Sequence, residues 1–493
     1  MELLKRLFRR EELTVEEVFR RAGLQPRPHQ LETAKLLLQQ LEACGRVALT
    51  APTGWGKTLV TLAALRVGGY LPILWLVRTI SLARHVEDEA ALLGLRSTTL
   101  LGKGRVCPYR SRVSDVYAYC RYNRAVCPFF QDLLRHGADH PTACPYYAAE
   151  VEAIECDVIV QSYHRRRVPC DVTVVDEAHN VLAPRSFKIY DDEVGFAWNA
   201  LKEYAGAEVA EEVRGILFSP APRVERLRQY EVEIKEALAE MARRMPSSRE
   251  FRALAKLYRA TRALALNREA GAGYVEAFYR PIRVRDPAVF VSATLPSRAC
   301  EVLNAPVIRV PGRRRVAYVL SWLTSRYGQE TIREYSLLLK MLRLKLGRIV
   351  AFTSERLAVK FLDIADYYEA DLSEIPGEWS GLMLLHSRGR FSEGVDIPAP
   401  CVVIVGCPFL PPSVSRKLSK VWGRGAGALS MSIVTLQNIG RAVRSPEHEP
   451  LILLADERFM RHRELFEEYL ELQPLESREQ LVKIVEDFKA RLK

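Results

Sequence analysis

The sequence lacks any long apolar run, and its acidic residues are outnumbered by basic ones. The longest apolar stretch among the 493 residues, at positions 71–77, is far too short to cross a bilayer, and the first eleven residues are charged throughout. We therefore expect a soluble, non-secreted, cytoplasmic protein with no membrane partner. Lys and Arg number 72 against 60 Asp and Glu, and the resulting net charge of +12 favours an anionic partner such as nucleic acid.

The sequence shows no export signal, which argues against a disulfide framework for its ten cysteines. Their expected roles are therefore metal ligation, catalysis or simple burial. Four of them are separated by 12, 6 and 16 residues, which matches neither ferredoxin spacing nor a paired zinc ribbon. Three of the four precede a proline, and this recurrence indicates one metal-binding set. Thiolates suit both zinc and iron–sulfur clusters, so spacing alone leaves both open. The set is Cys107, Cys120, Cys127 and Cys144.

A strand, a glycine-rich turn and a helix follow one another between residues 45 and 65. Residues 45–50 predict a buried strand, and the apolar spacing after residue 58 predicts a helix. The turn between them reads A-P-T-G-W-G-K-T, and its glycines can adopt positive φ while backbone amides surround a phosphate. We expect this turn to bind ATP with Mg²⁺. The predicted contacts are Thr53, Gly54, Trp55, Gly56, Lys57 at the β- and γ-phosphates, and Thr58 at the metal.

A second strand that ends in acids follows downstream. Residues 172–175 are β-branched and apolar, as in a central parallel strand, and D-E-A-H comes next. An isolated tetrapeptide of this kind is more often a solvated helix start, but its position after a phosphate-binding turn favours catalysis. Asp176 is expected to hold the Mg²⁺ shell and Glu177 to orient and deprotonate the attacking water. Predicted strands at 73–77 and 288–291 lead into Arg78-Thr79 and Ser292-Ala293-Thr294.

After residue 311 the α/β pattern starts again without a second phosphate-binding turn. A helix at 337–346 and strands at 348–352 and 382–385 predict another sheet, which would close over the nucleotide bound by the first. A polar segment, residues 387–396, lies between strands, and a helix carries Gln437, Gly440, Arg441 and Arg444 on one face. Two guanidinium groups on one face can stabilise charge on a transferred γ-phosphoryl group.

Two stretches interrupt the α/β pattern. Between residues 102 and 147, aromatic and arginine side chains alternate around the four cysteines, which suits either a grip on single-stranded nucleic acid or packing around a metal centre. Residues 195–275 lack strand patterning and predict an antiparallel helical hairpin. The basic runs at 165–167 and 313–315 lie beside predicted strand ends, where they are either phosphate contacts or solvated surface.

The ordered motifs resemble those of superfamily 2 helicases, and R-G-x-x-S-E-G-V-D at 388–396 with Q-x-x-G-R-x-x-R at 437–444 is similar to the XPD and DinG branch. The resemblance spans residues 27–444. It implies that Gln30 contacts adenine, that Ser292 to Thr294 couples hydrolysis to movement, and that residues 388–396 link nucleotide to DNA. It further implies that Gln437, Arg441 and Arg444 face the γ-phosphate, and that the four cysteines hold a 4Fe–4S cluster.

The resemblance also implies an α/β architecture of two tandem RecA-like parallel-sheet domains with a small four-cysteine cluster insertion and a helical arch insertion. The first motor domain is expected at residues 1–100, 151–194 and 276–310, and the second at 311–493. The cluster domain is expected at 101–150 and the arch at 195–275.

The implied function is that of an ATP-dependent DNA helicase in DNA repair. It would act as a monomer on single-stranded and forked DNA, move 5′ to 3′, and have repair-complex proteins as partners. Two alternatives remain: a translocase or lesion checker that does not separate strands, and a nucleic-acid-binding scaffold whose nucleotide site only switches conformation.

Overall fold

The computed structural model describes residues 13–52, 54–269, 271, 273–391, 395–443 and 448–492. The chain divides into two compact units. The first contains the chain up to Arg46 together with Thr58–Phe290 and Pro411–Gly423. The second contains Val47–Lys57, Val291–Leu410 and the chain from Arg424 onward.

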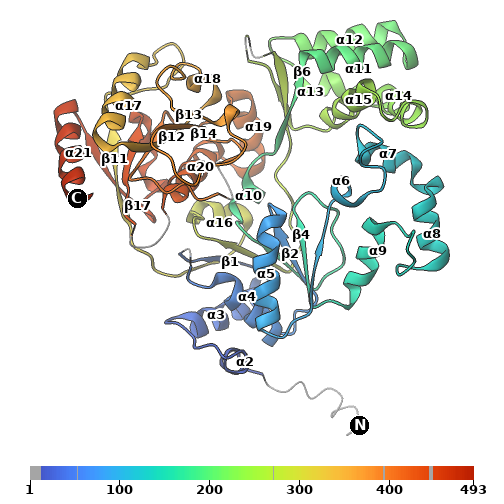
Figure 1. Cartoon of the computed structure of the whole chain (residues 1–493), viewed down its shortest axis with the longest axis horizontal. Helices are drawn as coiled ribbons and strands as arrows, with labels where there is room; N and C mark the ends of the chain where they lie inside the picture. The colour runs from blue at the N-terminus through green and yellow to red at the C-terminus, as the bar shows by residue number, and fades with distance from the viewer. Residues whose placement is uncertain are drawn as a thin grey trace. The chain divides into compact units, whose positions relative to one another are not determined.

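The first large sheet has seven strands in the order β10-β1-β9-β5-β2-β4-β3 (Figure 1). Every strand pair whose register is known within it is parallel. Both faces of such a sheet are covered, which is why β2 reads Ile-Leu-Trp-Leu-Val and is buried at every position. The strands predicted at 45–50, 73–77, 172–175 and 288–291 are confirmed. The bounds are β1 Arg46–Thr50, β2 Ile73–Val77, β3 Ser97–Leu100, β4 Val158–Ser162, β5 Val172–Val175, β9 Ala288–Ser292 and β10 Val307–Arg309.

Helices flank these strands in sequence, as a parallel sheet requires. Helix α3 ends at Gly45, which adopts the left-handed conformation that glycine takes without strain. The bounds are α2 Val15–Arg21, α3 Gln30–Cys44, α4 Lys57–Val67, η1 Ile80–Leu82, α5 Ala83–Leu92, α10 His179–Leu182 and α16 Ser297–Leu303.

The second large sheet, also seven-stranded and parallel, has the order β13-β14-β12-β15-β16-β11-β17. Successive residues of β12 point to opposite faces: Ile349 and Ala351 join the apolar cluster under α17 and α21, whereas Val350 and Phe352 join the cluster that includes α20. The predicted second sheet is confirmed. Its strands are β11 Arg315–Leu320, β12 Arg348–Thr353, β13 Tyr367–Tyr368, β14 Gly381–His386, β15 Cys401–Val405, β16 Leu451–Ala455 and β17 Leu470–Leu475.

The helices of this half are α17 Ile332–Leu346, α18 Glu355–Ala358, η4 Glu369–Asp371, α19 Pro412–Trp422, α20 Ala426–Ala442, η5 Glu457–Leu465 and α21 Arg478–Leu492. One of them, α19, groups with the first compact unit. Its Lys417 pairs with Glu225 at 2.8 Å, and Ser413 bonds to the side chain of Asn267 at 3.3 Å. Helix α19 therefore packs on the insertion described next.

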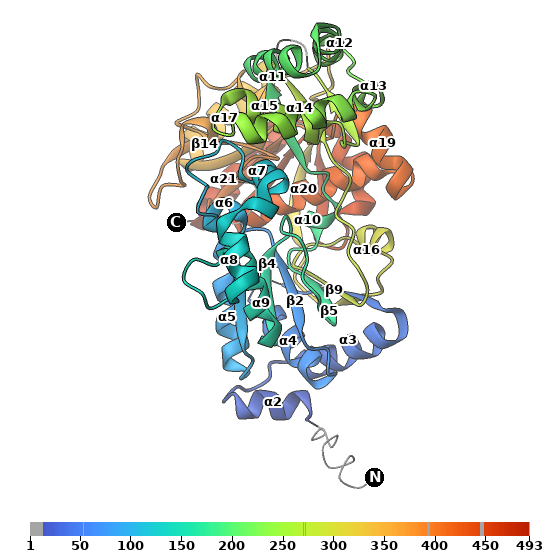
Figure 2. The same ribbon diagram turned by 90° about the vertical axis from the view of Figure 1, so that its right-hand side faces the viewer.

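The insertion expected to be helical is a five-helix bundle, green in Figures 1 and 2, with a small antiparallel sheet of order β6-β8-β7. The predicted hairpin is wrong in extent, because five helices and not two share one buried apolar core with β6 and β8. The predicted absence of strands is also wrong: β7 is too short to show a period of two in the sequence. The bounds are β6 Ser186–Tyr190, α11 Asp191–Tyr204, α12 Ala207–Phe218, α13 Val224–Arg228, α14 Glu231–Arg244, α15 Arg249–Ala260, β7 Ala265–Asn267 and β8 Tyr274–Phe278.

The four-cysteine segment is built from short helices, teal in Figure 2, and residues 101–157, all of them described, contain no strand. Two of its three Cys-Pro pairs have a local explanation, because Pro128 and Pro145 occupy the first positions of α8 and α9, where proline loses no hydrogen bond. We call residues 101–152 the four-cysteine subdomain. Its helices are α6 Lys103–Val106, α7 Val116–Asn123, η2 Arg124–Val126, α8 Pro128–His136 and α9 Pro145–Glu152, and η3 Ala153–Glu155 follows.

None of the helices in the described part of the chain is both long enough and apolar enough to span a bilayer.

Candidate nucleotide and nucleic-acid site

The glycine-rich turn has the predicted backbone. Gly54 and Gly56 adopt φ values of 77° and 96°, in the region that side chains disfavour. The turn connects β1 to α4, which begins at Lys57. The Lys57 ammonium donates to the carbonyls of Ala51 and Pro52, both at 3.1 Å. The backbone of the loop therefore binds the charged end of Lys57. The predicted contact Thr53 lies outside the described residues.

The polar segments named from the sequence follow neighbouring strands of the first sheet. Backbone bonds from Ala288 to the Gly45 carbonyl and from Ala51 to the Ser292 carbonyl make β1 and β9 parallel. In the order β1-β9-β5-β2, the strands are followed by the phosphate-binding turn, Ser292 to Thr294, D-E-A-H and Arg78-Thr79. The carboxyl edge of a parallel sheet is where such folds bind ligands.

The D-E-A-H segment is held by backbone bonds. The Asp176 amide donates to the Leu76 carbonyl at 3.0 Å, and the Asp176 carboxylate accepts from the Glu177 amide at 2.9 Å. Glu177 has a φ of 47°, one of three positive values among the described non-glycine residues. Its carboxylate lies 3.4 Å from the buried His179 imidazole.

Two residues beside this segment were not predicted from the sequence. Asn180 donates from its side chain to the Glu177 carbonyl at 3.0 Å and accepts from Arg78 at 3.0 Å. Tyr163, after β4, donates its hydroxyl to the Asp176 carbonyl. Asn180 follows D-E-A-H directly and could have been found by its position, whereas the contact of Tyr163 across a strand leaves no trace in the sequence.

Gln30 is the first residue of α3, and its side chain is buried. Its amide oxygen accepts from the Arg27 backbone at 2.8 Å, so the side chain is oriented by the turn that precedes the helix.

The second half contributes polar atoms that are buried and have no hydrogen-bond partner among the described residues. On α20 these are the Gln437 Nε2, Asn438 Oδ1 and Arg441 Nε atoms, and the Ser387 Oγ atom after β14 is a fourth. The Asn438 amide donates to the Ser387 carbonyl at 3.2 Å and so joins the two motifs. Unpaired buried polar groups are rare and call for a ligand or another partner. Arg444 and positions 392–394 of the loop lie outside the described residues.

The first residues of the loop after β14 are held by hydrogen bonds to other residues of the second compact unit. Arg388 donates to the Pro408 carbonyl at 2.9 Å and to the Ser430 hydroxyl at 3.1 Å. Glu369, which is buried, accepts from the amides of His386 and Arg390, both at 2.7 Å. These bonds fix the loop that the resemblance assigns to coupling between nucleotide and DNA.

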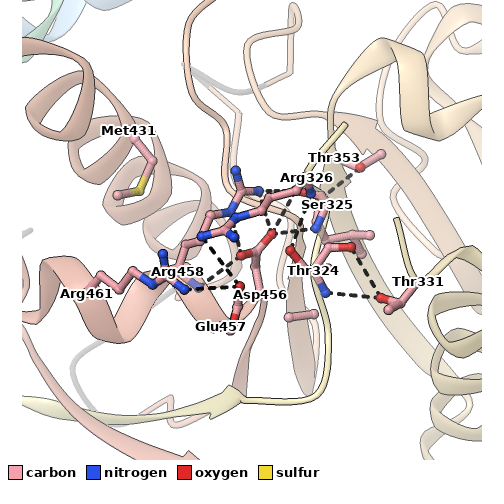
Figure 3. A network of polar contacts seen from close by, with 12 residues as sticks. Thr324, Ser325, Arg326, Thr331, Thr353, Met431, Asp456, Glu457, Arg458 and Arg461 are labelled. Atoms are coloured by element: carbon pink, nitrogen blue, oxygen red, sulfur yellow. Dashed lines mark hydrogen bonds and ion pairs between the residues drawn. The ribbon is translucent and has the colours of Figure 1, made fainter. Parts of the chain in front are cut away.

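A buried ion pair lies at the carboxyl edge of the second sheet (Figure 3). Asp456, just after β16, is fully buried and accepts from Arg458 at 2.7 Å and from the amide and hydroxyl of Ser325 at 2.9 and 2.7 Å. Burial raises the pKa of Asp456, but the bonds from Arg458 and Ser325 lower it by more, so the net pKa lies below its ordinary value. The sequence analysis did not predict this pair. The pattern that could have indicated it is an acidic residue directly after an apolar strand, with an arginine two residues later.

The four cysteines predicted as ligands are all free thiols, of which Cys107 and Cys144 are buried. Burial raises the pKa of Cys107, and the charges of Cys120, Cys144 and Cys127 raise it further. Backbone bonds at Tyr147 and Tyr146 partly offset a similar rise at Cys144. Within the described residues, no group of three or more His, Cys, Asp or Glu side chains is arranged to hold a metal ion.

A lysine lies beside these thiols. The Lys103 ammonium is 3.1 Å from the Cys120 sulfur and 3.2 Å from the Tyr147 hydroxyl. Burial lowers its pKa, but these two partners raise it by more. The ammonium therefore stays charged next to the sulfur.

Most of the aromatic rings of the four-cysteine subdomain pack against one another. Tyr109 contacts Tyr119 and Phe129 with ring centroids 5.3 and 5.7 Å apart, and Phe130 contacts Tyr147 at 5.0 Å. Tyr117 is an exception, with 52% of its surface exposed. Of the two alternatives drawn from the sequence, these ring pairs favour packing around the thiols.

Neither alternative drawn from the sequence, a phosphate contact or a solvated surface residue, holds for Arg165. Its side chain is 1% exposed and pairs with Glu150 at 2.6 Å. It also donates to the carbonyls of Leu101 and Tyr146 at 3.2 and 3.1 Å, and its guanidinium lies 4.0 Å from the centroid of the Tyr146 ring. In the second basic run, Arg313 pairs with Glu449.

Comparisons with known proteins agree with this architecture. Residues 364–472 match the family of helicase C-terminal domains. The S. tokodaii protein Xpd4 is 18% identical, with a TM-score of 0.57 over 91% of this chain and 100% of that chain. An apo XPD structure is 15% identical, with a TM-score of 0.58 over 90% of this chain and 100% of that one. The search of curated proteins gave no match.

Two parallel sheets, a phosphate-binding turn on the first and a helicase C-terminal domain on the second support a helicase-type ATPase that binds nucleic acid. Its fold resembles that of XPD, so the predicted resemblance is confirmed at the level of the fold.

Proposed function

We propose that this chain is an ATP-dependent DNA helicase of XPD type that moves along single-stranded DNA and opens forked duplexes in DNA repair. The observation that carries the proposal is the order of polar segments along the carboxyl edge of the first sheet. A turn with two positive-φ glycines precedes a lysine, and two acids follow a neighbouring parallel strand. This is the set that phosphoryl transfer to water requires.

Within this site each residue has a separate task. Lys57 would leave the two loop carbonyls and bind the β- and γ-phosphates, since an ammonium prefers charged phosphate oxygens to neutral carbonyls. Thr58 and Asp176 would hold Mg²⁺, which neutralises phosphate charge. Glu177 would orient and deprotonate the attacking water. Gln30 and the loop from Thr53 to Gly56 would hold the base and the phosphate chain.

We infer that Gln437, Arg441 and Arg444 face the γ-phosphate. The unpartnered Gln437 and Arg441 nitrogens support this inference for the two described residues, because a phosphate oxygen would satisfy them. Hydrolysis would then be sensed by the second half through the same helix that Asn438 connects to the loop after β14.

We also propose that Cys107, Cys120, Cys127 and Cys144 hold a 4Fe–4S cluster. The chemistry of the donors supports this proposal: all four are free thiols, backbone amides donate toward Cys107 and Cys144, and Lys103 supplies a cation beside Cys120. When bound, the cluster would crosslink the four-cysteine subdomain. The ring-lined subdomain and the helical bundle would serve as the arch region around one DNA strand, with the protein acting as a monomer alongside repair proteins.

Hydrolysis and unwinding test the proposal directly. ATPase activity should rise with single-stranded DNA, and a 5′-tailed forked duplex should be opened faster than a 3′-tailed one. Lys57→Ala should lower kcat/KM for ATP by about a thousandfold or more, because the phosphate charge loses its main cation. Lys489→Ala, an exposed lysine on α21, is the matched control and should keep parental turnover.

Two other outcomes would contradict this proposal and support one of the alternatives. DNA-stimulated hydrolysis without duplex opening would identify a translocase. Absence of hydrolysis in the parent, with DNA binding unchanged by Glu177→Gln, would identify a scaffold.

A further inference from the structure

Tyr163 makes a contact that spans a strand of the first sheet. It follows β4, and β2 lies between β4 and β5. The Tyr163 amide donates to the Val77 carbonyl at 3.1 Å, which fixes the residue at the end of β2. Its hydroxyl reaches past β2, donates to the Asp176 carbonyl and lies 3.4 Å from the Glu177 carbonyl. The ring is buried, with 7% of its surface exposed.

The backbone that receives this contact is in an unfavourable conformation. Glu177 has a φ of 47°, which side chains of this size rarely adopt and which surrounding contacts must maintain. The Glu177 carbonyl accepts two further bonds from Asn180, from its amide at 2.9 Å and from its side chain at 3.0 Å. The two consecutive carbonyls of the Asp-Glu pair are therefore both held by donors.

The hydroxyl of Tyr163 is suited to act as a permanent donor. Burial, followed by the charges of Asp176 and Glu177, raises its pKa well above the ordinary value of 10.0. It therefore remains protonated at any pH at which the protein would work.

We propose that Tyr163 is a positioning residue for ATP hydrolysis, whose hydroxyl holds the left-handed turn that aims the Glu177 carboxylate at the attacking water. The proposal rests on the proposed function, because it assigns Glu177 to the water. The Tyr163 hydroxyl contacts the Asp176 and Glu177 carbonyls and the Asn180 side chain, and it is assigned no contact with nucleotide. Its loss should therefore slow the chemical step and leave nucleotide binding unchanged, because small displacements of a base lower the rate strongly.

Tyr163→Phe removes only the oxygen atom. We expect kcat for ATP to fall about tenfold or more while KM and the ADP dissociation constant stay within about twofold of the parent. Tyr279→Phe is the matched control, since Tyr279 is a half-buried tyrosine of the same unit whose buried hydroxyl has no hydrogen-bond partner among the described residues. It should keep the parental kcat.

A parental kcat in Tyr163→Phe would overturn the proposal, as would an equal loss in both tyrosine variants or a loss expressed in KM alone. If Tyr163→Phe does not fold, Asn180→Ala tests the same turn, since it removes another donor to the Glu177 carbonyl. An undiminished kcat there would also overturn the proposal. These outcomes differ from failure of the proposed function, in which the parent itself would not hydrolyse ATP.

Discussion

The second large sheet and the four-cysteine subdomain are held together in different ways. The sheet has an apolar cluster on each face, with buried residues from six of its seven strands in each cluster. In the subdomain, few residues are buried: Cys107, Val116, Ala143, Cys144, Tyr146 and Ala148. Two of these are thiols. A segment with so little apolar burial cannot offset the entropy of ordering its chain and needs crosslinks or external anchors.

The subdomain's anchors are polar contacts to its neighbours in the first unit. Arg165 bonds to Leu101 near the start of the subdomain and to Tyr146 and Glu150 near its end. On the helical bundle, Ser114 donates to the Ser248 carbonyl at 2.7 Å. In addition, Ala118, Tyr119 and Tyr122 of α7 pack against the apolar core of the helical bundle. The two ends of the subdomain are joined by one side chain, that of Arg165, which can be removed by mutation.

The largest expected effect is loss of the cluster. Cys144→Ser should abolish bound iron and the broad visible absorption, and the four-cysteine subdomain should become sensitive to limited proteolysis, because the crosslink carries its folding energy. The two large sheets should stay resistant. Iron analysis and mass spectrometry of the fragments measure both effects, with Cys156→Ser as the control. A parent protein with stoichiometric zinc and no visible absorption would contradict the cluster.

The next effect concerns the buried pair of the second sheet. Arg458→Met leaves the Asp456 carboxylate buried without its cation, which should lower the free energy of unfolding by about 3–5 kcal/mol. Urea denaturation measures the loss. The double variant Asp456→Leu, Arg458→Met should recover much of it, and a double variant as unstable as the single one would show that the arginine acts otherwise.

The pair of Asp456 and Arg458 should make the stability of the second compact unit depend on pH. Because the folded pKa of Asp456 is lowered below its ordinary value of 3.8, its stabilisation is complete above that value. The stabilisation is lost as the pH falls further, through the lowered folded pKa. The difference in stability between the parent and Asp456→Asn should therefore shrink in acid.

A smaller effect is expected from the loss of Arg165, which contacts both ends of the four-cysteine subdomain. Arg165→Met removes the cation from Glu150, whose side chain is 20% exposed and can be partly rehydrated, so we expect a loss of about 1–3 kcal/mol. Hydrogen exchange should accelerate in α6 and α9, while Lys57-dependent ATPase activity without DNA persists. Unchanged hydrogen exchange in these helices would show that the Arg165 contacts are not needed to keep the subdomain folded.

The smallest effect is expected at the ion pair between Asp115 and Arg259, 3.0 Å apart with the arginine 43% exposed. Solvent screens such pairs, so a double-mutant cycle should give a coupling of about 0.2–1 kcal/mol. A coupling several times larger would indicate that this contact, and not Arg165, fixes the subdomain.

The sequence revealed the sheets because buried parallel strands are continuous apolar runs, as in β2 and β15, and because the motifs stand at strand ends. It misjudged Arg165, since a run of three arginines is typical of an exposed surface and only the folded chain brings Glu150 and Tyr146 around it. It missed Tyr163 for the same reason. Contacts across a sheet depend on strand order, which periodicity does not contain.

The strand order of the first sheet has a consequence for synthesis on the ribosome. Strand β9 lies between β1 and β5, although it is encoded more than a hundred residues after β5. The strand that precedes the phosphate-binding turn therefore acquires this neighbour only after Ala288–Ser292 has emerged. Until then the growing chain exposes unpaired strand edges, and pairing between strands so far apart in sequence is intrinsically slow and exposed to aggregation.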